Sequence, residues 1–260
     1  MPKLSRIPLA PLRPGARKLL QSPQAMHAAV LGAVAYHPEP GRTLWRLDAD
    51  NRHRPYLYVL TQVEPDWTAM TEQAGWQIDD PNAKPAVADY TRLLAGLRSG
   101  QEYAFRLTAA PVQNVRNPNK PSPLQKARMS DETRRSFRMG HRTTAHQLQW
   151  FTSRVKKFGF DLVEIPATVP AAPGILPFTD RITTEEPVLD VRVTGHARLV
   201  FTKTETRPDG TTFPNTVALT TATYAGTLRV TDPASLGRAL LAGIGPGKGY
   251  GCGLLTLAAV

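Results

Sequence analysis

The stretch that decides the fold is Leu44–Leu60, with the sequence LWRLDADNRHRPYLYVL. Aliphatic and aromatic residues gather at its two ends, in Leu44–Leu47 and Tyr56–Leu60, and the residues between them are mostly polar. Two short apolar runs separated by a polar turn predict a pair of antiparallel strands. The elements that flank this hairpin then indicate the architecture of the first half of the chain.

A helix and a strand are expected before the hairpin. Ser22 is a favourable N-cap and Pro23 suits the first helical position, so the helix begins there and ends before Pro38. Upstream, residues 3–9 predict a short strand. Pro8 cannot donate to a ladder and should stop or bulge that strand.

A second helix and a last strand are expected after the hairpin. Asp66 can cap a short helix that runs through Ala74. The alternating residues of Tyr103–Thr108 then predict a half-buried strand. The order strand, helix, strand, strand, helix, strand is that of a ferredoxin-like domain, which we place at residues 1–112.

The second half of the chain repeats these ingredients. After a basic linker at 113–142, we expect a helix at 143–158, a strand at 160–165 and a proline-rich loop at 166–177. The two strands of a long hairpin follow at 188–203 and 216–230, and then a helix at 232–241 and a last strand at 254–257. Gly159 is placed to end the first of these helices. The predicted fold class is α+β, with two tandem ferredoxin-like (RRM-like) βαββαβ domains, the second spanning 143–260.

Composition excludes several classes of protein. With 41% hydrophobic residues among 260, the chain can bury a core, and its one cysteine, Cys252, excludes a disulfide framework and a multi-cysteine zinc site. No window approaches 18 uncharged apolar residues, and the first residues do not form a secretory signal. We therefore expect a globular protein of the reducing cytoplasm that has no membrane association.

The charge indicates a polyanionic partner. The formal net charge is +11, and eleven Lys and Arg residues against two acidic ones fall between Arg116 and Lys157. Arginine-rich basic surfaces bind phosphates, although a solvated surface segment is the alternative explanation. The residues we expect to bind nucleic acid are Arg128, Arg134, Arg135, Arg138, Arg142, Lys203, Arg207 and Lys248.

Glycine occupies every second position near the C-terminus, at Gly243, Gly245, Gly247, Gly249, Gly251 and Gly253. Residues 243–253, here called the glycine-rich segment, fit neither G-x-G-x-x-G nor a P-loop, and they lead into a strand rather than a helix. The spacing indicates backbone that approaches something closely. The alternative is close packing against the preceding helix.

His27 is the candidate for acid–base chemistry. It lies in the first turns of the helix that begins at Ser22, beside the apolar stripe of Met26 and Val30, and an imidazole titrates near neutral pH. Its spacing alone also allows a structural role. No carboxylates converge for a two-metal nuclease and no cofactor motif is present, so any RNA cleavage must proceed without metal.

Motifs along nearly the whole chain resemble those of the CasE (Cse) family, the CRISPR repeat-RNA endoribonucleases of type I-E systems. The matching stretches are Pro23-x-x-Met26-His27, Leu44–Leu47, Thr61–Trp67, Phe105–Leu107, Gln149–Phe151, Tyr224–Leu228, Gly243–Lys248 and Gly251–Leu255. They occur in the order that the family has, and the glycine-rich segment is the most specific of them.

The resemblance implies a metal-independent endoribonuclease that cleaves CRISPR precursor RNA at the base of a repeat stem-loop. It implies that the RNA 2′-hydroxyl attacks the phosphate, leaving a 2′,3′-cyclic phosphate and a 5′-hydroxyl. The family's catalytic histidine falls on His27. The implied partners are the repeat stem-loop RNA and the other subunits of the Cascade complex, in which the enzyme often stays on its product.

Two departures from the family keep an alternative open. Some members have a tyrosine three residues before the histidine, where this chain has Gln24, which can serve as neither acid nor base. The hairpin is also thinner in basic residues, with Lys203 and Arg207 on either side of Glu205. The alternative is a catalytically silent RNA-binding scaffold subunit of the same superfamily.

Overall fold

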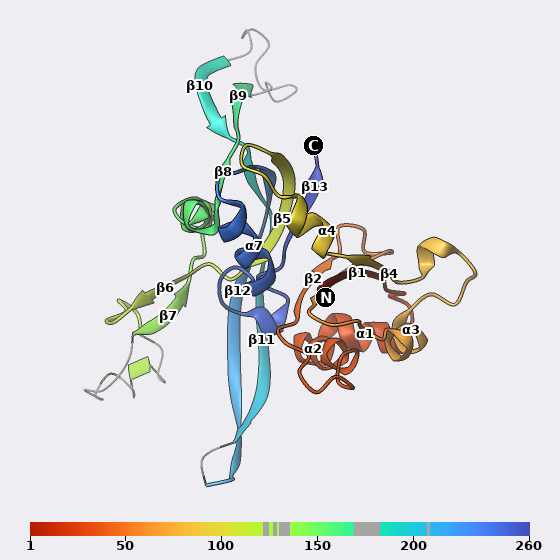
Figure 1. The fold of residues 1–260 in the computed structure, drawn as a ribbon. Coiled ribbons are helices and arrows are strands. Elements are labelled where there is room, and N and C mark those ends of the chain that lie inside the picture. Colours follow the sequence, from red (N-terminus) through yellow and green to blue (C-terminus); the bar gives the residue numbers. More distant parts are fainter. Residues whose placement is uncertain (122–124, 127–128, 130–135, 169–182, 207–208) are drawn as a thin grey trace, which may run out of the picture.

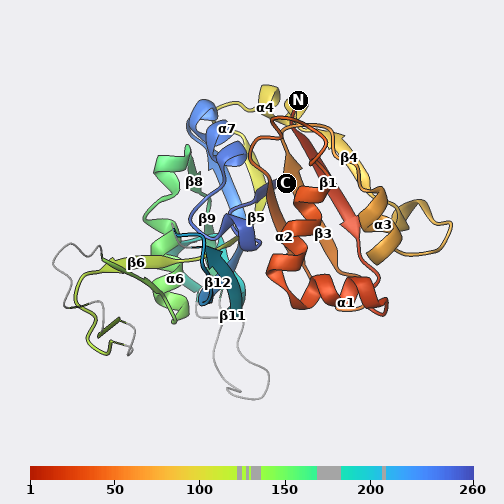
Figure 2. The ribbon, with the colours of Figure 1, turned by 90° about the horizontal axis from the view of Figure 1, so that it is seen from below.

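The computed structural model describes residues 1–121, 125–126, 129, 136–168, 183–206 and 209–260. It consists of two α/β halves placed side by side, with the N-terminal half in red to orange and the C-terminal half in green to blue (Figure 1). A view from below shows the same two halves, with helix α2 of the N-terminal half on the side toward the C-terminal half (Figure 2). No helix in the described parts of the chain is long and apolar enough to span a membrane.

The first domain is built on a four-stranded antiparallel sheet of order β2-β3-β1-β4. Its elements are β1 (Lys3–Pro8), α1 (Pro14–Gln21), α2 (Pro23–Gly32), β2 (Leu44–Asp48), β3 (Tyr56–Thr61), α3 (Thr68–Ala74), the 3₁₀ turn η1 (Pro81–Ala83), β4 (Ala86–Asp89) and α4 (Thr91–Gly96). The predicted hairpin and the predicted end of β1 at Pro8 are confirmed.

One face of this sheet is covered by helices. Ile7 and Leu57 of the sheet pack against buried residues of α1, α2 and α3, including Met26. Side chains alternate along β2, so Trp45 joins this helical core while Leu44 and Arg46 lie on the opposite face and are buried there. The second domain covers that opposite face, because Leu44 and Leu60 belong to its core cluster.

The second domain has a sheet of order β11-β12-β5-β13, with β8 paired to the far end of β12. Its elements are β5 (Glu102–Ala109), α6 (Thr144–Thr152), the 3₁₀ turn η2 (Val155–Phe158), β8 (Phe160–Leu162), β11 (Val191–Thr206), β12 (Thr212–Val230), α7 (Pro233–Ala242), the 3₁₀ turn η3 (Lys248–Tyr250) and β13 (Leu255–Ala259). If β5, β11, β12 and β13 are counted as the first to fourth strands of this domain, their order in the sheet is 2-3-1-4, the same as in the first domain. Both domains are therefore ferredoxin-like, and the predicted tandem fold is confirmed.

The boundary between the domains differs from the prediction. The sequence predicts that the strand at Tyr103–Thr108 closes the first sheet, but β5 pairs with β12 and β13 and forms the centre of the second sheet. The short strand β4 takes its place in the first sheet. The alternation of apolar and polar residues along β5 indicates only that one face of the strand is buried. A strand in either sheet would show the same alternation, so the pattern does not identify the sheet.

Three smaller regions complete the description. The predicted linker contains a two-stranded sheet of β6 (Val112–Val115) and β7 (Phe137–Gly140). Pro166, expected in a loop, lies instead in β9 (Glu164–Thr168), which pairs with β10 (Thr183–Leu189) across a register shift. Two-stranded ribbons tolerate proline because each strand has a free edge.

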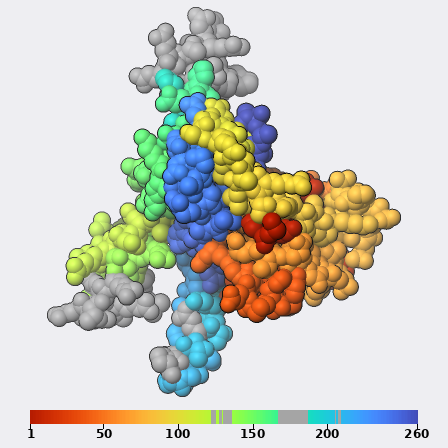
Figure 3. All heavy atoms as spheres, in the orientation of Figure 1, coloured from red at the N-terminus to blue at the C-terminus, as the bar shows by residue number. Residues whose placement is uncertain are grey.

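The long hairpin of β11 and β12 extends beyond the body of the protein (Figure 3). Fifteen residue pairs run from Val191–Gly226 to Thr206–Thr212, as the alternation along both strands predicted. At its base, Gly226 leaves room for the Asp190 carbonyl, which a side chain would overlap. The pairing of β11 with β12 therefore begins beside the residues of β12 that pair with β8.

Candidate functional site

His27 lies on the side of α2 that faces the second domain. The Ser22 hydroxyl accepts a hydrogen bond from the amide of Ala25 at 3.2 Å and caps the helix, as predicted. The His27 ring is half-buried, and its Nδ1 is enclosed without a hydrogen-bond partner. Burial lowers the pKa of His27 below its ordinary value, so the neutral ring predominates at pH 7.

The glycine-rich segment closes into a loop that meets this histidine. The amide of Ile244 donates to the carbonyl of Gly253 at 2.9 Å, which joins the two ends of the segment. A Cβ added at Gly249 would lie 3.3 Å from Nε2 of His27. At Gly249, the close approach that the glycine spacing indicated is therefore to a helix of the other domain.

The other glycines serve the shape of the loop. Five of them, Gly243, Gly245, Gly247, Gly251 and Gly253, have φ between +76° and +94°, a region that side chains rarely adopt. Gly249 is the exception, because its backbone is ordinary and only the nearby His27 ring restricts it. The segment thus holds two kinds of glycine, which require different tests.

Lys248 is the cation nearest to this contact along the chain. It begins η3, directly before Gly249, and its stem runs across the loop, with Cε 3.0 Å from a Cβ placed at Gly243. Burial, and in second place the nearby Arg42 guanidinium, lower the pKa of the Lys248 ammonium. Two cations therefore lie near each other here, as suits a site for an anion.

The long hairpin of the second domain is hydrogen-bonded to α2. The side-chain amide of Gln24 donates to the carbonyl of Thr202 in β11 at 2.6 Å. Phe201, beside it, packs on the ring of Tyr250 with the ring centroids 4.7 Å apart. Gln24 thus has a defined structural role, as a link between α2 and β11.

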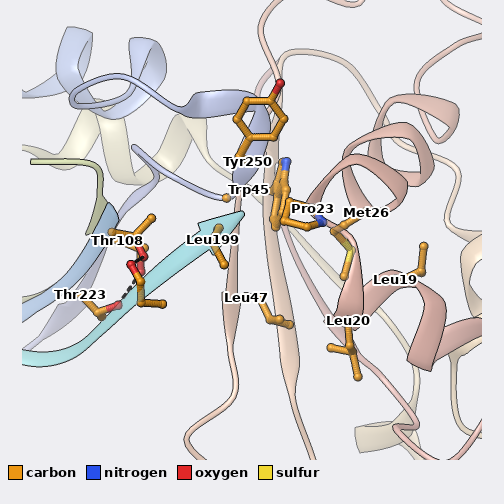
Figure 4. A pocket seen from close by; sticks show the side chains of 13 residues that line it. Leu19, Leu20, Pro23, Met26, Trp45, Leu47, Thr108, Leu199, Thr223 and Tyr250 are labelled. Carbon is orange, nitrogen blue, oxygen red and sulfur yellow. Dashed lines mark hydrogen bonds between the residues drawn. The ribbon is translucent and has the colours of Figure 1, made fainter. Parts of the chain in front are cut away.

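A mostly apolar cavity of about 250 Å³ lies behind the site, between α1 and α2 on one side and the hairpin on the other. Trp45 and Tyr250 line the end of it that adjoins the glycine-rich segment, while Leu199 comes from β11 (Figure 4). Thr108 and Thr223 also line the cavity, and their hydroxyl groups are hydrogen-bonded to each other, with the oxygens 2.9 Å apart.

The structure brings some of the predicted basic residues to this site and leaves others apart. Arg138 lies on β7 and lines a groove with Gly247 and Tyr250, so it joins the glycine-rich segment. Arg142 lines a separate hollow with Lys120, beside β6 and β7. Lys203 is on β11, one residue beyond Thr202. Arg128, Arg134, Arg135 and Arg207 lie outside the described residues.

Several residues of the site escaped sequence reasoning. No sequence motif includes Arg42 or Thr202, and none singled out Tyr250. These residues meet at the site because the two domains pack together. Tyr250 alone had a usable signal, since it is the one aromatic residue among the alternating glycines. Within the described residues, no three His, Cys, Asp or Glu side chains come together as metal ligands.

Comparison with known proteins identifies the family of this chain. The model of the CRISPR associated protein family matches residues 4–259. The CRISPR-associated endoribonuclease Cse3 of Thermus thermophilus is 26% identical over 258 residues, which cover 98% of this chain and 99% of that protein.

Solved structures show the same fold. Thermus thermophilus Cse3 bound to an RNA representing a pre-cleavage complex superposes with a TM-score of 0.66 at 25% identity, over 99% of this chain and 98% of that one. Cas6e from Escherichia coli str. K-12 shares the fold with a TM-score of 0.51 at 18% identity, over the whole of both chains. The protein is therefore a member of the CRISPR-associated protein family, and the resemblance to the Cse (CasE) branch that its sequence predicted is confirmed.

Proposed function

We propose that this protein is a metal-independent endoribonuclease that cleaves CRISPR precursor RNA at the base of a repeat stem-loop. The observation that carries the proposal is the contact of His27, on one domain, with Gly249 of the glycine-rich segment, on the other. The related Cse3 is named an endoribonuclease and has been captured with RNA, which supports the same substrate class here.

The chemistry follows from the state of His27. Because burial favours its neutral form, His27 can accept the proton of the RNA 2′-hydroxyl, and Nε2 is the nitrogen to do so since Nδ1 is enclosed. The 2′-oxygen then attacks the adjacent phosphorus and the bond to the 5′-oxygen breaks. One strand ends in a 2′,3′-cyclic phosphate, and the other, after protonation of the leaving oxygen, in a 5′-hydroxyl.

Lys248 and Arg42 supply the charge that this reaction needs. Negative charge grows on the phosphate oxygens as the 2′-oxygen attacks, and fixed cations beside it lower the barrier. Lys248 precedes Gly249 directly, and the desolvation that lowers its pKa also strengthens its attraction to an anion. We assign Lys248 to the scissile phosphate or to its neighbour.

Stem binding is assigned to the basic residues around the site. Arg138 adjoins the glycine-rich segment, and Arg142 and Lys120 extend the positive surface along β6 and β7. An A-form stem hides its base edges in a narrow groove, so contacts to phosphates carry most of the affinity. We further propose that the protein acts in the cytoplasm and stays with its product as a Cascade subunit.

The test is cleavage of a repeat stem-loop RNA by the wild-type protein in EDTA, with end-group analysis of the products. We expect cleavage to a 2′,3′-cyclic phosphate, and no cleavage of a matched RNA that has a 2′-deoxyribose at the scissile nucleotide. A requirement for a divalent metal, or cleavage of the deoxy substrate, would overturn the mechanism.

A silent RNA-binding scaffold is the second candidate. The use of Gln24 as a clasp to Thr202, where some relatives have a tyrosine, favours it. In the same assay the scaffold would bind the stem-loop and leave it intact at any enzyme concentration, which separates the two functions.

A further inference from the structure

Strand β2 holds the glycine-rich segment at three points with three consecutive residues. A Cβ at Gly243 would lie 2.8 Å from Cδ2 of Leu44, and one at Gly251 would lie 2.8 Å from Cζ3 of Trp45. Nη1 of Arg46 lies 3.2 Å from the carbonyl oxygen of Leu254, the residue that follows the segment. The start of the loop, the residue after η3 and the exit of the loop are thus fixed by one strand of the other domain.

Arg46 is the polar member of this set, and it is almost completely enclosed, with 2% of its surface exposed. Its Nε and Nη2 donate to the two carboxylate oxygens of Asp48 at 2.7 and 2.9 Å. Its Nη1 lies 2.8 Å from both the carbonyl oxygen of Arg106 and the hydroxyl of Thr256. One guanidinium therefore ties β2 to β5, to β13 and to the end of the glycine-rich segment.

A lysine could not make the same set of contacts. Its single ammonium cannot pair with both oxygens of Asp48 and also reach acceptors on the far side of the interface, whereas the flat guanidinium fork has donors on both edges. This requirement explains an arginine at a position where the remainder of the strand, Leu44 to Leu47, is apolar.

The contacts of Arg46 cross the same domain interface as the contact between His27 and Gly249. His27 and Arg46 belong to the same domain, and Gly249 and Leu254 belong to the other. The distance between His27 and Gly249 therefore depends on how the segment is seated on β2.

We propose that Arg46 is a positioning residue, which seats the glycine-rich segment on β2 so that Gly249 and Lys248 face His27. The catalytic part of this inference rests on the proposed function, since it assigns Arg46 a role in RNA cleavage. The positional part concerns the free protein and can be measured without RNA.

The test compares Arg46→Lys with Arg229→Lys, a control in the second domain. Arg229 pairs with Glu102 at 2.7 Å across β12 and β5, and both side chains are far more exposed than Arg46. NMR of the free protein follows the imidazole signal of His27, assigned by its loss in His27→Ala, and the amide signal of Gly249. Single-turnover cleavage at saturating enzyme and the dissociation constant of the stem-loop are measured in parallel.

We expect Arg46→Lys to shift both NMR signals and to slow cleavage by about tenfold to a hundredfold, because small displacements of reacting groups are costly. The dissociation constant should change by less than about threefold, since Lys248 supplies only one of the proposed phosphate contacts and the others come from residues outside the glycine-rich segment. Arg229→Lys should change none of these quantities. Unshifted His27 and Gly249 signals, or a loss of cleavage matched by the loss of folded protein, would overturn the proposal.

Thr256→Val keeps the test decisive if Arg46→Lys does not fold. It removes only one acceptor of Nη1 and leaves the pair with Asp48 intact, so we expect smaller shifts of the same two signals. If neither signal moved, Arg46 would not position the segment. If His27→Ala cleaved at the wild-type rate while the signals moved, the proposed function would fail and the positional role would stand.

Discussion

The two domains share one topology, but the segment between the second helix and the last strand differs completely between them. In the first domain it spans residues 75–85, between α3 and β4, and contains a single glycine and the acidic pair Asp79 and Asp80. In the second domain it spans 243–254, between α7 and β13, and contains six glycines and one cation, Lys248.

This difference is the basis on which we place the proposed site. The first domain contributes a side chain from a helix, His27, and the second contributes backbone that side chains would block. Neither contribution forms a site alone, because the close contact crosses the interface. A ferredoxin-like topology therefore says little about activity, and the segment that departs from the common pattern carries the information.

The largest effect is expected from a side chain placed in the glycine-rich segment where it meets His27. Gly249→Val should reduce cleavage by about a hundredfold or more, since a Cβ there already lies 3.3 Å from Nε2 and valine adds two methyl groups. Single-turnover cleavage of the stem-loop checks this, with circular dichroism to confirm folding.

Gly251→Ala is the matched control for the second kind of glycine. It forces a side chain onto φ +80° and against the ring of Trp45, so its cost should fall on stability, at about 1–2 kcal/mol. If Gly251→Ala lowered cleavage as much as Gly249→Val without lowering the melting temperature, the distinction between the two kinds of glycine would be wrong.

The protonation of His27 gives the next effect. Its pKa is lowered by burial, so the neutral base forms as the pH rises through a value below 6.5. Under conditions that report kcat/KM, the rate should fall about tenfold per pH unit on the acid side and level off at neutral pH. A rate that instead decreases as the pH rises from 5 to 7 would assign His27 the role of an acid.

Removal of the Lys248 ammonium should have a smaller effect, on the salt dependence of RNA binding. Lys248→Ala removes one phosphate contact, so the slope of log affinity against log salt should become shallower by about 0.7–0.9. Filter binding of the stem-loop over a range of salt concentrations measures this slope. If Lys248→Ala left both slope and cleavage unchanged, the lysine would serve only to brace the loop.

Much of the fold could be predicted from local signals in the sequence. Ser22 and Asp232 mark the starts of helices as expected, since both accept capping hydrogen bonds. The helix expected over 143–158 is shorter, because α6 ends at Thr152, and Gly159, with a φ of +82°, instead ends the 3₁₀ turn η2. The exact sheet to which β5 belongs could not be predicted, because pairing partners are set by the packing of distant strands. The strand β4, Ala86–Asp89, was missed because it is short and exposed, with little apolar patterning.

The candidate site was predictable only in its parts. The position of His27 followed from family resemblance, and the glycine spacing indicated a close approach. That these two features meet depends on the packing of one domain on the other, as does the interdomain anchor at Arg46. No pattern within a single segment records such a contact.

His27 is proposed to transfer a proton at a site formed between the domains, and the variant His27→Ala removes the group that would do so. In single-turnover cleavage of a repeat stem-loop in EDTA, we expect a loss of about 10²–10⁴-fold, with the melting temperature and the dissociation constant of the RNA nearly unchanged. Gln24→Ala, the control on the same helix, loses only the hydrogen bond to Thr202 and should slow cleavage far less. Cleavage by His27→Ala at the wild-type rate would contradict the account and place the active site elsewhere.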